Sequence, residues 1–153
     1  MSEFKRNQIL KEVRNICADE ISVEQKLTKI CQLLEENVPY YDWVGFYFAE
    51  NEREELILGP FVGEPTEHTK IPYGKGICGQ VARKQETFLI NDVSAEQNYL
   101  ACSIKVKSEI VIPIFKNGVF VAQLDIDSHT PSAFSDEDKQ FLQDISEYVG
   151  NIL

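Results

Sequence analysis

The sequence has little positive charge. It carries 15 Lys and Arg residues against 25 Asp and Glu residues, for a net charge of −10. A chain with this balance repels phosphate backbones, so we expect no nucleic-acid binding through a basic face. No apolar run approaches the ~18 residues that would cross a bilayer. Residues 1–6 begin no hydrophobic signal-peptide core. We therefore expect a cytoplasmic protein that does not associate with a membrane.

The sequence also lacks internal repeats, low-complexity tracts and linker-like stretches. Its 153 residues fit one domain, and 43% of them are hydrophobic, which is enough to build a core without covalent staples. We expect one domain over residues 1–153.

Close pairs of metal-binding residues are missing as well. The four cysteines, Cys17, Cys31, Cys78 and Cys102, form no CxxC pair and have no nearby histidine, so a structural zinc site is not expected. In a reducing compartment they would remain thiols. Cys17 and Cys31 fall on apolar helical faces and are expected to be small core residues.

The pattern of apolar residues predicts helices at both ends of the chain. Residues 4–17 place Phe4, Leu10, Val13 and Cys17 at spacings of 6, 3 and 4, which predicts an amphipathic helix. Ser22 opens a second helix that ends near residue 38. Ser135 caps a last helix that continues to the end of the chain. Strands are predicted at residues 43–48, 56–58, 88–93, 108–115 and 119–127.

Two features of the segments between these helices decide the fold class. Asn117-Gly118 is a strong hairpin signal, and Gly59-Pro60 is expected to break the second strand. Mostly hairpin-linked strands between terminal helices indicate an α+β fold. We expect an antiparallel sheet of five or six strands with the N-terminal and C-terminal helices packed on it.

The glycine-rich segment at residues 74–79 contains Cys78. It matches neither the GxxxxGK[ST] nor the GxGxxG phosphate-binding pattern, so a tight turn into a short helix is the simpler interpretation. A thiol in the first turn of a helix lies near its N-terminal amides, which stabilise a thiolate. We therefore expect a lowered pKa for Cys78.

Cys102 lies in a polar loop. Lys105 and Lys107 are close in sequence and would favour the thiolate, but an incidental loop cysteine explains the position equally well. A covalent nucleophile needs thiolate character, access and a proton donor for the leaving group.

Three acids lie on neighbouring predicted strands: Glu109, Asp125 and Asp127. They could form a solvated strand end, or they could line a pocket that binds a cation and holds a proton. In such a pocket a carboxyl with a raised pKa acts as a general acid near neutral pH. A metal site is disfavoured, because His129 is the one histidine adjoining them in sequence.

Trp43 and Tyr47 are four residues apart on one predicted strand and so share a face. They could be core residues or an aromatic wall that contacts a ligand. His68 is expected to be exposed.

Several segments together resemble a known family. In order they are residues 43–47, 58–63, 71–79, 101–102, 108–113 and 124–128. The set is similar to single-domain GAF proteins that are free methionine-(R)-sulfoxide reductases. The resemblance covers residues 20–153, with residues 1–19 as an added N-terminal helix.

The resemblance implies reduction of the sulfoxide of free methionine. By motif position Cys102 corresponds to the nucleophile and Cys78 to a second cysteine. The carboxylates and the aromatic wall of the pocket correspond to Glu109, Asp125, Asp127, Trp43 and Tyr47. Glu109 or Asp125 would donate the proton, and Asp127 would pair with the substrate ammonium.

One position departs from the family pattern, because His68 stands where the resolving cysteine usually lies. Cys78 could replace that thiol, an external thiol could do so, or the chain could be a degenerate member of the family. The resemblance implies no bound cofactor or metal, and a thioredoxin-like protein or small thiol as reductant. A sensory GAF domain that binds a small molecule without catalysis is the alternative, and a homodimer is left open.

Overall fold

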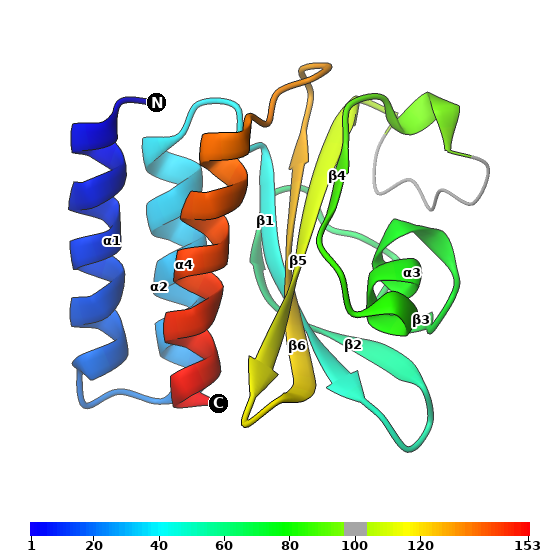
Figure 1. Cartoon of the computed structure of the whole chain (residues 1–153), viewed down its shortest axis with the longest axis horizontal. Coiled ribbons are helices and arrows are strands. Elements are labelled where there is room, and N and C mark those ends of the chain that lie inside the picture. The colour runs from blue at the N-terminus through cyan, green and yellow to red at the C-terminus, as the bar shows by residue number, and fades with distance from the viewer. Residues whose placement is uncertain (97–103) are drawn as a thin grey trace.

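The computed structural model describes residues 1–96 and 104–153. In this part of the chain a six-stranded antiparallel sheet has helices on both faces (Figure 1). The helices α1 (Glu3–Ala18), α2 (Val23–Asn37) and α4 (Asp136–Ile152) lie on one side, and the short helix α3 (Gly76–Lys84) lies on the other. The predicted α+β fold is confirmed.

The two central strands of the sheet are the first and the last strand in the sequence. Its strands are β1 (Trp43–Glu50), β2 (Glu55–Val62), β3 (Lys70–Pro72), β4 (Phe88–Ile90), β5 (Ser108–Lys116) and β6 (Val119–Ser128). Their order is β3-β2-β1-β6-β5-β4, and every neighbouring pair is antiparallel. The Asn117-Gly118 turn joins β5 to β6 as predicted, with both turn residues at positive φ.

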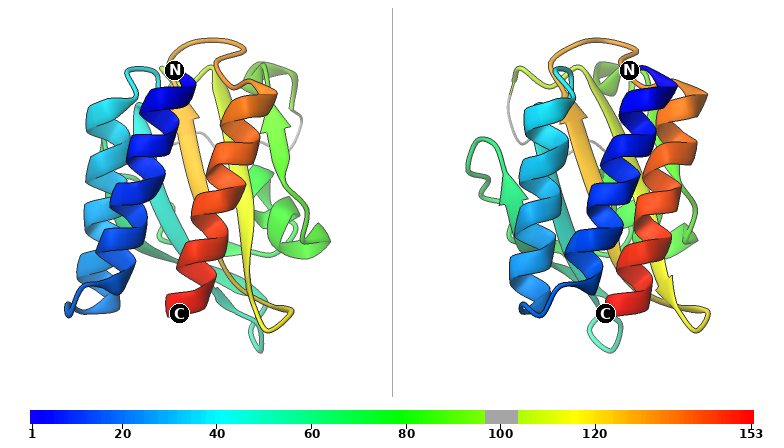
Figure 2. Two further views of the ribbon diagram at one scale, coloured as in Figure 1. Left: turned by 60° about the vertical axis from the view of Figure 1, so that its left-hand side comes forward. Right: turned by 90° about the vertical axis from the view of Figure 1, so that its left-hand side faces the viewer.

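The helices form two layers. Figure 2 shows α1 as an outer layer across α2 and α4, which themselves cover the sheet. Ile9 and Val13 of α1 are buried, whereas Phe4 is 71% exposed. The prediction that Phe4 lies on the apolar face is wrong, because it precedes Val13 by nine residues, about two and a half helical turns, and so lies on the opposite face of α1. None of the helices among the described residues is long and apolar enough to cross a membrane.

Two predicted strand boundaries are corrected. β2 does not break at Gly59-Pro60 but continues to Val62. The register with β1 shifts between Gly45 and Tyr47, so β2 accommodates one extra residue as a bulge. Strand β4 ends earlier than predicted, at Ile90, because the Asp92 side chain accepts a hydrogen bond from the Ser94 amide and starts a 3-10 turn.

Alternation along the strands divides the interior into two cores. On the helical side, Leu124 and Ile126 of β6 pack with Ile110 of β5 and with α1, α2 and α4. On the α3 side, Trp43 and Tyr47 of β1 belong to a second apolar cluster. This second core also receives the predicted acids.

Candidate functional site

Helix α3 brings Cys78 against the sheet. The turn into α3 uses positive φ at Gly74 and Gly76, +90° and +67°. A Cβ atom on Gly79 would lie 2.6 Å from the carbonyl oxygen of Pro72, so only glycine permits this close approach. The side-chain amide of Gln123 on β6 donates to the carbonyl oxygen of Cys78 over 3.2 Å. The Cys78 thiol is buried between α3 and the sheet.

The three predicted acids lie together on the α3 face of the sheet. Glu109 of β5 pairs directly with Asp127 of β6, and Asp125 lies two residues before Asp127 on the same face. Their exposed fractions are 4% for Glu109 and 1% for each aspartate. The alternative of a solvated strand end is therefore excluded.

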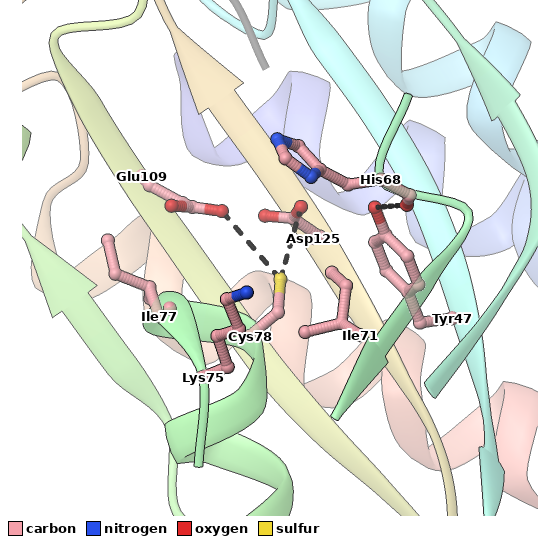
Figure 3. A pocket seen from close by; sticks show the side chains of 9 residues that line it. Tyr47, His68, Ile71, Lys75, Ile77, Cys78, Glu109 and Asp125 are labelled. Atoms are coloured by element: carbon pink, nitrogen blue, oxygen red, sulfur yellow. Dashed lines mark hydrogen bonds between the residues drawn. The ribbon is translucent and has the colours of Figure 1, made fainter. Parts of the chain in front are cut away.

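The Cys78 thiol faces two of these carboxyls (Figure 3). Its Sγ atom lies 3.4 Å from Oδ2 of Asp125 and 3.9 Å from Oε2 of Glu109. The structure thus brings Cys78 next to Asp125, which lies 47 positions later in the sequence.

Burial favours the protonated forms of Glu109 and Asp125. Loss of water raises the pKa of Glu109 well above its usual range, and the charges of Asp125 and Asp127 raise it further. Burial also raises the pKa of Asp125, although hydrogen bonds from Glu109 and Cys78 oppose this effect. The expectation of a carboxyl with a raised pKa is met by both groups, and such a group donates a proton near neutral pH.

The expectation for Cys78 is wrong in sign. Burial raises the pKa of the Cys78 thiol well above its usual value, and the charges of Asp125 and Glu109 add to this rise. The thiol does lie in the first turn of α3, but the partial charge of a helix N-terminus is small beside the effect of burial next to carboxyl groups.

A small cavity adjoins the thiol. Its volume is about 10 Å³, about what one water molecule requires. The described residues that line it are Tyr47, His68, Ile71, Lys75, Gly76, Ile77, Cys78, Glu109 and Asp125.

His68 lies at this cavity rather than in open solvent. It is partly buried, and Figure 3 shows its imidazole near Asp125. The hydroxyl of Tyr47 donates to the His68 carbonyl oxygen over 3.0 Å and so holds this loop against the sheet. The prediction that His68 is exposed is therefore wrong.

Trp43 lies beside the cavity and is not among the described residues that line it. Its ring stacks on Phe61 with centroids 5.4 Å apart and on Tyr47 with centroids 6.4 Å apart. The indole nitrogen donates to the carbonyl oxygen of Glu64. A Cβ on Gly45 would lie 2.4 Å from the indole, so the absence of a side chain there makes room for Trp43.

The other cysteines occupy different environments. Cys31 is buried in the helical core and Cys17 is half-buried, in agreement with their predicted packing role. Cys102 lies outside the described residues.

The sequence did not predict that His68, Ile71 and Lys75 line the cavity. It also did not predict the hydrogen bond from Gln123 to the Cys78 carbonyl oxygen. The one signal for His68 in the sequence was the departure from the family pattern that the resemblance implied at this position. Gln123 gives no such signal in the sequence.

The comparisons with known proteins agree with this architecture. The model of the GAF domain matches residues 20–153. The chain belongs to the GAF domain family. This GAF domain is 33% identical over 138 residues to the free methionine-R-sulfoxide reductase of Escherichia coli, with 90% of this chain and 82% of that protein covered.

Two solved structures are also similar to this GAF domain. The free methionine-R-sulfoxide reductase of Neisseria meningitidis, in complex with its substrate, superposes with a TM-score of 0.92 at 32% identity, covering 99% of this chain and 91% of that one. The reduced form of fRMsr of Staphylococcus aureus superposes with a TM-score of 0.89 at 36% identity, covering 97% and 94%.

Proposed function

We propose that this protein reduces the sulfoxide of free methionine. The observation that carries the proposal is the burial of a thiol and two carboxyls around one cavity of a GAF domain. Similar proteins named free methionine-R-sulfoxide reductase support it. We take the (R) configuration at the substrate sulfur from the names of those proteins.

The first step uses Cys102 as nucleophile. Its thiolate attacks the sulfoxide sulfur while a carboxyl of Glu109 or Asp125 gives a proton to the oxygen. The S–O bond breaks as the protonated oxygen passes to the Cys102 sulfur, and the transient bond between the two sulfurs breaks with its electron pair on the substrate sulfur. Methionine leaves, and Cys102 becomes a sulfenic acid. The raised pKa of both carboxyls supports this role, because a proton is then available near neutral pH.

The remaining groups position the substrate. Asp127 pairs with the substrate ammonium, and Trp43 and Tyr47 supply an aromatic wall for the methyl end. Ligand pockets usually measure several hundred Å³. The cavity of about 10 Å³ is therefore too small for the substrate, and its lining side chains have to move apart when the substrate enters.

The second step regenerates the nucleophile. The Cys78 thiol attacks the sulfur of the Cys102 sulfenic acid, and its proton passes through Asp125 to the departing hydroxyl, which leaves as water. The 3.4 Å distance between Cys78 Sγ and Asp125 supports this proton transfer. A thioredoxin-like dithiol then reduces the Cys78–Cys102 disulfide and is itself oxidised.

An assay on the two sulfoxide diastereomers of free methionine tests the proposal. With dithiothreitol as reductant, we expect turnover of the (R) form and background rates for Cys102→Ser. Equal rates for the two proteins would reject the reductase and leave the alternative of a ligand-binding GAF domain.

A second assay tests the role of Cys78. With thioredoxin as reductant, Cys78→Ser should lose turnover, whereas it should keep turnover with dithiothreitol. Unchanged thioredoxin-dependent turnover would remove Cys78 from the mechanism.

A further inference from the structure

We propose that Cys78, Glu109 and Asp125 form a binding site for a zinc ion, with the thiolate and the two carboxylates as ligands. The site is independent of the proposed reductase activity, since it needs neither Cys102 nor a sulfoxide. It does overlap the place where the proposed reaction occurs.

The spacing of the ligand atoms fits a tetrahedral ion. A zinc ion with one Zn–S bond of about 2.3 Å and one Zn–O bond of about 2.0–2.2 Å separates the two ligand atoms by about 3.5 Å. The two distances from Cys78 Sγ to carboxyl oxygens are 3.4 and 3.9 Å. One ligand atom from each of the three residues lies within 4.8 Å of the others. Small side-chain adjustments therefore suffice to close the site around an ion.

The two carboxyl groups of this site also lack a cationic partner among the described residues. Glu109 and Asp125 make no ion pair with any Lys, Arg or His of the described residues. Oδ1 of Asp125, buried within the cluster, accepts no hydrogen bond from the described part of the chain. A proton shared between the carboxyls or a bound metal ion is what compensates such a group.

The donor set selects the kind of ion. A thiolate is a soft ligand that favours zinc over magnesium and calcium, which prefer oxygen alone. The adjoining cavity of about 10 Å³ leaves room for a fourth ligand, either water or the His68 imidazole that lines it. Three protein ligands with an open fourth position describe a zinc ion that exchanges and that blocks the pocket.

Titration of the reduced, metal-free protein with ZnSO₄ tests the site. Affinity is measured by calorimetry or by competition with a zinc-binding dye. We expect one ion per chain, no binding of Mg²⁺, and a thiolate-to-metal absorption band when Co²⁺ is substituted.

Variants locate the ion. Cys78→Ser and Asp125→Asn should each weaken zinc binding by at least about 100-fold, the upper end of what losing an outer-shell partner costs. Cys31→Ala, which changes a buried thiol of the helical core, should leave the affinity unchanged. Circular dichroism checks that each variant is folded, and Asp125→Asn carries the test if Cys78→Ser does not fold.

Two results would overturn the site. One is unchanged zinc affinity in Asp125→Asn, and the other is loss of affinity in Cys102→Ser with Cys78→Ser unaffected. Neither result depends on turnover, so failure of the zinc site and failure of the reductase are distinguishable. If both proposals hold, zinc inhibits sulfoxide reduction, and a chelator restores it.

Discussion

The two faces of the central sheet differ in kind although the same strands build them. On β6, Leu124 and Ile126 point into the helical core, while Asp125 and Asp127 point toward α3. The hydrocarbon face can only stabilise the fold, and the acidic face costs stability through desolvation and repulsion. Alternate residues of β6 thus belong to the apolar core on one face of the sheet and to the candidate site on the other.

The largest expected effect comes from placing an acid on the hydrocarbon face. Ile126→Asp buries a carboxyl where the surrounding core is apolar, so we expect a loss of more than about 4 kcal/mol in the free energy of unfolding, or no folding. Urea denaturation measures the loss. Ile126→Val is the matched control and should cost about 1 kcal/mol. A similar cost for both variants would contradict the contrast between the faces.

The converse change on the acidic face should spare the fold. Asp125→Asn keeps the shape of the side chain and removes its charge, so we expect stability within about 1 kcal/mol of the unaltered protein or above it. If Asp125 is the proton donor of the proposed reaction, kcat/KM for the sulfoxide should fall about 100-fold or more. Steady-state kinetics and urea denaturation on one preparation separate the two effects. A strong loss of stability would show that Asp125 holds the fold together.

The acidic face also predicts how stability depends on pH. The pKa of Glu109 in the folded protein is raised above its ordinary value of 4.5, so the folded chain keeps a proton that the unfolded chain loses. This contribution to stability is complete below about pH 4.5 and is lost as the pH rises toward the folded pKa. Each unit of elevation corresponds to about 1.4 kcal/mol.

Glu109→Gln isolates this contribution because glutamine cannot ionise. The stability of the variant relative to the unaltered protein should increase between pH 4.5 and pH 8, as measured by urea unfolding at several pH values. A difference that stays constant with pH would mean that Glu109 ionises normally.

The smallest expected effect concerns the thiol of the helical core. Cys31 is buried, and its Sγ lies 3.7 Å from the carbonyl oxygen of Pro60. Cys31→Ala should cost about 1 kcal/mol through lost packing and leave kcat/KM unchanged. Thermal unfolding and the sulfoxide assay measure the two quantities. A drop in activity would show that the helical core also supports the chemistry.

The sequence predicted the fold well where local signals and burial agree. Ser22 and Ser135 mark helix starts because their side chains cap backbone amides, and both form capping boxes in the structure. Gly59-Pro60 was misread because a bulge, which depends on the partner strand, keeps both residues within β2. Phe4 was misread because its distance of nine residues from Val13 does not fit the helical period and places it on the exposed face of α1.

The candidate site was predicted in part: the raised pKa of a carboxyl was expected, the direction of the Cys78 shift was not, and Cys102 lies outside the described residues. Cys78, Glu109 and Asp125 were each singled out, and the structure brings them together. The direction of the Cys78 pKa depends on the carboxyl groups across the sheet and on complete burial, and neither is visible in the local sequence. The place of His68 at the cavity likewise depends on the Tyr47 hydrogen bond across the fold.

The Gln123 side chain has a mechanical consequence. Its amide fastens the backbone of Cys78 to β6, two residues before Asp125 on the same face of that strand. A shift of β6 therefore carries the fastening point and the carboxyl along together. The distance between the Cys78 sulfur and the Asp125 carboxyl should therefore change little when the sheet moves. A longer or shorter amide side chain at position 123 would change this distance without altering Cys78 or Asp125.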